Sequence, residues 1–121
     1  MLEAINLKVF LPAKNFSESR GFYRELGFTE NWSNDDLAEF QLGQNKFLLQ
    51  DFYEQKLAEN LMMQLVVRDL DAWCRAIQDR KLVEAYSEVK IRAPEIQPWG
   101  QRVMYLWDPS GILWHFAEES K

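Results

Sequence analysis

The sequence has few of the residues and segments that anchor a chain covalently or in a membrane. Its single cysteine, Cys74, excludes an internal disulfide and fits a reducing compartment. No apolar run approaches the roughly 20 residues that cross a bilayer, and residues 1–4 lack the basic start and apolar stretch of a signal peptide. These absences predict a cytoplasmic protein with no membrane partner.

Basic charge is also scarce. The chain has 14 basic and 19 acidic residues, a formal net charge of −5. A nucleic-acid partner requires a basic face, so we expect none. The acidic excess is compatible with a cationic ligand, although a mild excess is also an ordinary way to stay soluble.

Patterns of catalytic residues are missing as well. The five glycines are scattered, so there is no phosphate-binding loop, and no serine lies in a nucleophile elbow. Cys74 falls on the apolar face of a predicted helix, which favours a place in the core. The only histidine is His115, and a lone histidine is more often packed than catalytic. These observations favour a binding protein over an enzyme.

Aromatic residues, in contrast, are plentiful: five Trp, eight Phe and four Tyr. Most rings in a small protein form its core, but several of these fall near turn signals, where rings can line a cleft.

Hydrophobic periodicity and turn signals predict an α+β fold. Asn15, with Glu18 three positions on, is typical of a helix start, and Gly27 of a helix end; Asp69 can cap a second helix. The predicted strands are residues 4–11, 28–33, 37–42, 46–51, 61–67, 82–86, 103–107 and 112–117, with a long loop at 87–100.

The predicted order is β-α-β-β-β, twice. The two helix caps are 54 positions apart in the sequence, which indicates an internal duplication. We expect one domain over residues 1–121, with module one at about 1–58 and module two at about 59–121. Alternation in the last strand places His115 on one face with Leu113 and Ala117.

Two stretches resemble the vicinal oxygen chelate superfamily, which includes glyoxalase I, extradiol dioxygenases and bleomycin-resistance proteins. The first is residues 10–15 followed by 22–28, a helix ending in Phe-Tyr-x-x-Leu-Gly-Phe. The second is residues 92–100, Arg-Ala-Pro-Glu-Ile-Gln-Pro-Trp-Gly, with Asp-Pro-Ser-Gly at 108–111 and His-Phe at 115–116. The second stretch is similar to the bleomycin-resistance branch in particular.

The resemblance implies two βαβββ modules whose curled mixed sheet forms a cup with helices outside. It also implies a homodimer with crevices shared between the chains. Enzymes of the superfamily hold a divalent metal through His, Glu or Gln side chains. The matching positions here are Lys8, Met62, either Leu49 or Gln50, and His115. At most two of them could ligate, so we expect no metal site and no cofactor.

The same resemblance suggests where a ligand would lie. In resistance proteins the counterpart of Trp99 stacks on the flat drug, and Trp32 and Phe40 are plausible companions, with core packing equally open for both. Leu37 and Gln64 match positions that can be aromatic in those proteins, and His115 could hydrogen-bond a ligand. A negative crevice attracts the drug's cationic tail there. The acidic residues that cluster near these rings are Glu30, Asp35, Asp36, Glu39 and Asp51, and we count Asp36 among the site residues.

Three hypotheses follow. The first is a metal-independent protein of the bleomycin-resistance type that sequesters a flat cationic ligand in a dimer crevice. The second is a metal-dependent enzyme of the glyoxalase or dioxygenase kind. The third is a binder of an unrelated metabolite.

Overall fold

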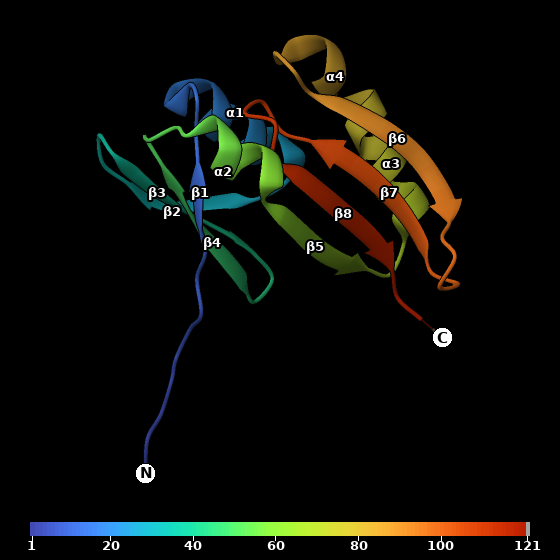
Figure 1. Ribbon diagram of the computed structural model, residues 1–121, viewed down its shortest axis with the longest axis horizontal. Helices are drawn as coiled ribbons and strands as arrows, with labels where there is room; N and C mark the ends of the chain where they lie inside the picture. The colour runs from blue at the N-terminus through green and yellow to red at the C-terminus, as the bar shows by residue number, and fades with distance from the viewer. Residues whose placement is uncertain (121) are drawn as a thin grey trace.

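A computed structural model describes residues 1–120 of the chain (Figure 1). The elements follow in the order β1 (Phe10–Pro12), α1 (Phe16–Leu26), β2 (Thr29–Ser33), β3 (Leu37–Leu42), β4 (Asn45–Gln50), α2 (Gln55–Asn60), β5 (Met62–Val67), α3 (Leu70–Asp79), α4 (Leu82–Ala85), β6 (Lys90–Ile96), β7 (Arg102–Trp107) and β8 (Leu113–Glu118). The predicted α+β class and the repeated strand-helix-strand-strand-strand order are confirmed.

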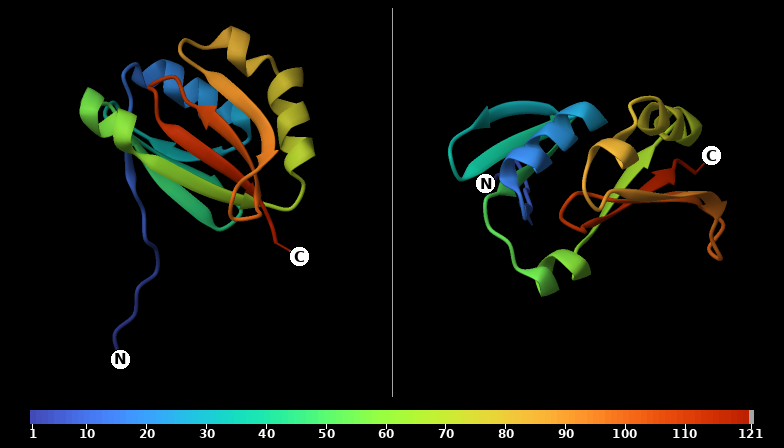
Figure 2. Two further views of the ribbon diagram at one scale, coloured as in Figure 1. Left: turned by 45° about the vertical axis from the view of Figure 1, so that its right-hand side comes forward. Right: turned by 90° about the horizontal axis from the view of Figure 1, so that it is seen from above.

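The strands form two mixed sheets with the same topology. The first has the order β1-β4-β3-β2 and the second β5-β8-β7-β6. In each sheet the module's first strand runs parallel to its last, and the other pairs are antiparallel. The two sheets lie side by side without closing into a barrel (Figure 1), and α3 lies along the second sheet (Figure 2).

The helix caps are those that the sequence predicts. The Asn15 side chain accepts a hydrogen bond from the Glu18 amide at 3.0 Å, and the Asp69 side chain accepts one from Ala72 at 2.9 Å. Gly27 ends α1 with φ of 126°, a conformation that a residue with a Cβ rarely adopts.

Both outer strands contain a β-bulge. The pairing of β2 with β3 shifts between Glu30 and Trp32, and that of β6 with β7 shifts between Arg92 and Glu95. A bulge places an extra residue opposite one partner and bends the strand. The equivalent place of the two bulges agrees with a duplicated module.

One hydrophobic core joins the two modules. Tyr23 of α1 contacts the rings of Phe40, Phe47 and Trp114, the last from the second sheet. Its hydroxyl donates to Asp108 Oδ2 at 2.5 Å and accepts from Trp114 Nε1 at 3.0 Å. This network links the first helix to the loop and last strand of the second module.

Four parts of the predicted secondary structure are wrong or incomplete. The first strand covers only Phe10–Pro12, although the residue before it, Val9, still accepts a backbone hydrogen bond from Leu48 of β4 at 2.9 Å. Residues 82–86 are not a strand, because α4 occupies Leu82–Ala85. The second strand of that module is instead β6, inside the predicted loop at 87–100. The short helix α2 was not predicted.

Candidate ligand-binding site

Each sheet has one face buried in the core and one open face. In the first sheet Ala38, Phe40, Phe47 and Leu49 point to the core. The alternating residues therefore form the open face. Its members are Lys8, Phe10, Asn31, Trp32, Leu37, Glu39, Gln41, Lys46, Leu48 and Gln50.

The bulge in β2 brings two side chains to this face together. Trp32 pairs with Glu39 and is 43% exposed. Asn31, next to it, donates to Glu39 Oε2 and to Gln41 Oε1, both at 2.8 Å. The indole of Trp32 therefore stands beside a polar cluster on an open surface, where it is available to a ligand.

Glu39 is the buried carboxylate of this cluster. Its side chain is 6% exposed and forms an ion pair with Lys8 Nζ. The hydrogen bond from Lys8, followed by that from Asn31, holds the pKa of Glu39 below its usual range. The carboxylate is thus ionised and neutralised by the chain's own lysine, and Lys8, at a position that could ligate a metal in related enzymes, binds a carboxylate instead.

The open face of the second sheet is organised in rows across its four strands. One row, which we call the arginine row, consists of successive register partners: Gln64, His115, Tyr105 and Arg92. The lysine row beside it contains Met62, Leu113, Trp107 and Lys90. His115 meets Tyr105 edge-on, with ring centroids 4.7 Å apart.

The rows run from neutral side chains on the inner strand to cations on the outer strand. Lys90 Nζ lies 4.8 Å from the centroid of the Trp107 ring, and Arg92 Cζ lies 5.9 Å from that of Tyr105. Tyr105 also donates from its hydroxyl to Gln97 Oε1 at 3.2 Å. Partial burial lowers the pKa of His115, so its imidazole is neutral at neutral pH and has one N–H donor.

Trp99 lies beyond these rows, in the loop between β6 and β7. The loop is closed by backbone hydrogen bonds between Gln97 and Gln101 and from Gly100 to Gln97, each 2.8 Å. The indole is 60% exposed, and its nitrogen donates to Gln101 Oε1 at 3.2 Å. Trp99 is therefore held in a turn with most of its ring exposed.

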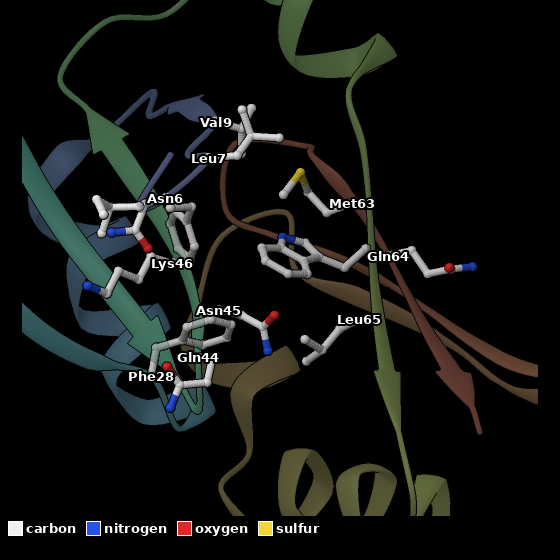
Figure 3. Close-up of a pocket in the computed structure, with 13 residues that line it drawn as sticks. Asn6, Leu7, Val9, Phe28, Gln44, Asn45, Lys46, Met63, Gln64 and Leu65 are labelled. Carbon is white, nitrogen blue, oxygen red and sulfur yellow. The ribbon is translucent and has the colours of Figure 1, made fainter. Parts of the chain in front are cut away.

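A cavity of about 400 Å³ lies at the seam between the two sheets. Figure 3 shows Met63 and Leu65 of β5 on one side of it and Lys46 and Asn45 of β4 on the other. Leu7 and Val9, which precede β1, lie at one end (Figure 3). Of the sequence-predicted ligand residues, only Gln64 lines this cavity.

The structure distributes the predicted site residues between the two open faces. Trp32 and Leu37 lie on the first sheet, with Asp36 in the exposed turn before Leu37; Gln64 and His115 are register partners on the second. Trp99 belongs to the far end of the second module, and the β2–β3 hairpin and the β6–β7 loop lie at opposite ends of the molecule (Figures 1 and 2).

Phe40 is corrected. It is fully buried, stacked on Phe47 with ring centroids 5.5 Å apart, because its neighbour Glu39 takes the open face and alternation turns Phe40 to the core. Tyr105, Trp107, Lys90 and Arg92 were missed. The alternating Tyr-x-Trp of a predicted strand was the signal that could have found the two rings.

Two further features concern metals and membranes. Within residues 1–120, no three side chains of His, Cys, Asp or Glu gather into a group that could hold a metal ion. In the same part of the chain, no helix combines the length and apolar character that a membrane crossing requires.

Two repeated βαβββ modules in one chain are the fold of the vicinal oxygen chelate class of proteins. The chain belongs to the Glyoxalase/Bleomycin resistance protein/Dioxygenase superfamily, whose family model matches residues 7–116. A search of curated protein sequences finds no match.

Solved structures agree with this assignment. A bleomycin-binding protein complexed with bleomycin is 25% identical with a TM-score of 0.81, covering 97% of this chain and 100% of that one. A bleomycin resistance determinant encoded on the transposon Tn5 is 23% identical (TM-score 0.78, 97% and 100% covered). TnmS3, an antibiotic-binding protein from Streptomyces sp. CB03234, is 19% identical (TM-score 0.77, 99% and 100% covered).

Proposed function

We propose that this protein sequesters a flat small molecule in a crevice formed where two copies of the chain meet. The observation that carries the proposal is the pair of open sheet faces, each with exposed or half-buried rings: Trp32 on one, Tyr105 and Trp107 on the other. Rings held on rigid strands stack on flat ligands at little cost in conformational entropy. The likeness to bleomycin-binding and antibiotic-binding proteins supports this type of function.

The placement of these rings favours a homodimer. Strand β2, which contains Trp32, and the β6–β7 loop, which contains Trp99, lie at opposite ends of the molecule (Figure 1). A crevice that uses both rings would therefore take them from different chains. Exposed apolar side chains supply the surface that a second copy would cover: Leu2, Ile5, Leu7, Phe10, Met62 and Val66 are all between 51% and 101% exposed. Exposed apolar patches of this kind are typical of interaction sites.

The charge that a ligand of the first module should carry depends on which acidic residues there remain unpaired. Of the acidic residues that favoured a cationic ligand, Glu30 is paired with Arg20 and Arg24, and Glu39 with Lys8. Asp35 and Asp36 remain exposed in the turn before β3, and they are the groups that would attract a cationic drug to the first module.

Sequestration needs affinity only, so this function requires no metal. The alternative, a glyoxalase-like or dioxygenase-like enzyme, needs several ligands around one ion. The matching positions place Lys8 in an ion pair with Glu39 and Met62 opposite Leu113, and neither arrangement supplies oxygen or nitrogen lone pairs to a cation.

The test is a titration of chelator-treated protein with metal-free bleomycin, followed by tryptophan fluorescence and calorimetry. Saturable binding at micromolar affinity or tighter, near one drug per chain, supports the proposal. Trp32→Ala and Trp99→Ala should each weaken binding about tenfold, in line with roughly 1–3 kcal/mol for the ring's stacking and burial.

The matched control is Val83→Ala, which truncates an exposed apolar residue on α4 and should leave affinity unchanged. Sedimentation analysis should give twice the chain mass. A monomer that nevertheless binds the drug at full affinity would overturn the shared crevice, and stoichiometric zinc or iron in the untreated protein would favour the enzyme.

A further inference from the structure

The open face of the second sheet is polarised across its strands. In the arginine row, Gln64 and His115 on the inner strands lead to Tyr105 and then to Arg92 on the outer strand. In the lysine row, Met62 and Leu113 lead to Trp107 and then to Lys90. The two neighbouring rows therefore have the same order of side-chain types across the strands: neutral residues, then an aromatic ring, then a cation.

Both cations lack a carboxylate partner. Over residues 1–120, neither Lys90 Nζ nor the Arg92 guanidinium has a carboxylate oxygen within 4 Å, whereas Arg20, Arg24, Arg68 and Arg102 all have one. Two acidic residues at the lysine end, Glu59 and Glu88, border the same hollow as Lys90 and Trp107. Glu59 accepts from Gln55 Nε2 at 2.8 Å, and Glu88 lies 3.7 Å from Lys14 Nζ.

Both cations are exposed to solvent, and each also lies near a ring: Lys90 near Trp107 and Arg92 near Tyr105. A guanidinium near an aromatic ring keeps its N–H donors free at its edge, and those donors match a carboxylate, phosphate or sulfonate in two parallel hydrogen bonds. A cationic ligand that stacks on Tyr105 or Trp107 would meet Arg92 or Lys90 as a like charge. An anionic ligand would meet them as partners of opposite charge.

We propose that this face binds an aromatic ligand with an anionic group, whose ring lies over Tyr105 and Trp107 and whose carboxylate, sulfonate or phosphate is held by Arg92 with Lys90. The polar end of the arginine row, Gln64 and the neutral His115, faces the opposite end of the ligand and can donate to an acceptor there. The inference rests on the proposed function and narrows it to a class of ligand. It differs from the cationic ligand that the sequence predicts.

The experiment compares two probes with one ring system and opposite charge, 2-naphthoate and 2-naphthylmethylammonium. Each is titrated into the full chain by calorimetry and by tryptophan fluorescence at low salt. The expected result is saturable binding of naphthoate at least tenfold tighter than that of the ammonium probe. Raising the salt should weaken naphthoate binding, because exposed charge pairs are screened.

Variants test the assigned residue. Arg92→Gln should reduce naphthoate affinity at least tenfold and remove the preference over the ammonium probe. Arg92→Lys keeps the charge but not the paired N–H donors of the guanidinium, so its naphthoate affinity should lie between that of Arg92→Gln and that of the native chain. Arg75→Gln removes an exposed positive charge from α3, which packs on the other face of this sheet, and should change neither affinity. Circular dichroism verifies that every variant is folded.

The outcomes separate this inference from the proposed function. If the ammonium probe or metal-free bleomycin binds and naphthoate does not, the ligand-binding function stands and the anionic class is wrong. The anionic class is equally wrong if Arg92→Gln behaves like Arg75→Gln. If neither naphthalene probe nor bleomycin binds, both the function and the inference fall.

Discussion

Removing one buried oxygen, in Tyr23→Phe, tests whether the link between the modules stabilises the fold. The Tyr23 hydroxyl donates to Asp108 Oδ2 and accepts from Trp114 Nε1, and all three residues are buried. The substitution removes a hydrogen bond to a carboxylate, about 1.5–3 kcal/mol, and leaves a buried indole N–H without a partner, about 1–3 kcal/mol. Allowing for partial relaxation, we expect the free energy of unfolding to fall by about 3 kcal/mol.

Urea denaturation followed by tryptophan fluorescence measures this loss, and thermal unfolding should show a midpoint lower by about 10 °C. Tyr105→Phe is the control, because its hydroxyl is on the half-buried open face with a single bond of 3.2 Å to Gln97, and it should cost less than about 1 kcal/mol. A loss in Tyr23→Phe no greater than in Tyr105→Phe would refute the reasoning.

Two further predictions concern the core. Burial raises the pKa of Asp108 to about 6, above its unfolded value near 4, so this carboxyl's contribution to stability is greatest below about pH 4 and is lost as the pH rises through about 6. Asp108→Asn should remove that component from urea midpoints measured between about pH 4 and 7, and an unchanged slope would contradict it. Phe40→Ala should lower the free energy of unfolding by about 3–5 kcal/mol while the folded variant keeps its affinity for any ligand of the open face; a weaker complex in a folded variant would show that Phe40 contacts ligand after all.

Local chemistry made much of the fold predictable. Asn15 and Asp69 mark helix starts because their side-chain oxygens accept a hydrogen bond from a backbone N–H that has no partner within the helix. Gly27 marks a helix end because glycine, without a Cβ, adopts the positive φ found there. The alternation that separates His115 from its buried neighbours is equally local. These features depend on a few consecutive residues, so the sequence alone could reveal them.

The remaining features depend on neighbours that are distant in sequence. Pro94 and Pro98 suggested a loop, but Pro94 lies in β6 at the bulge of an outer strand, where a missing N–H costs no ladder bond. The pairing of Arg92 with Tyr105 and His115 requires the register of three strands. Phe40 is different, since its separation from Leu37 by three positions already implied opposite faces.

The two bulges have a consequence for growth by self-association. β2 and β6 are the outer edges of their sheets, and an unprotected outer edge can pair with further molecules without limit, as in a fibril. A bend in each outer strand, reinforced in β6 by Pro94, opposes such pairing. The strand edges left regular, β1 and β5, are the inner ones that border the seam. The homodimer proposed above would then form away from the bent outer edges, as a closed pair of finite size rather than an open-ended polymer.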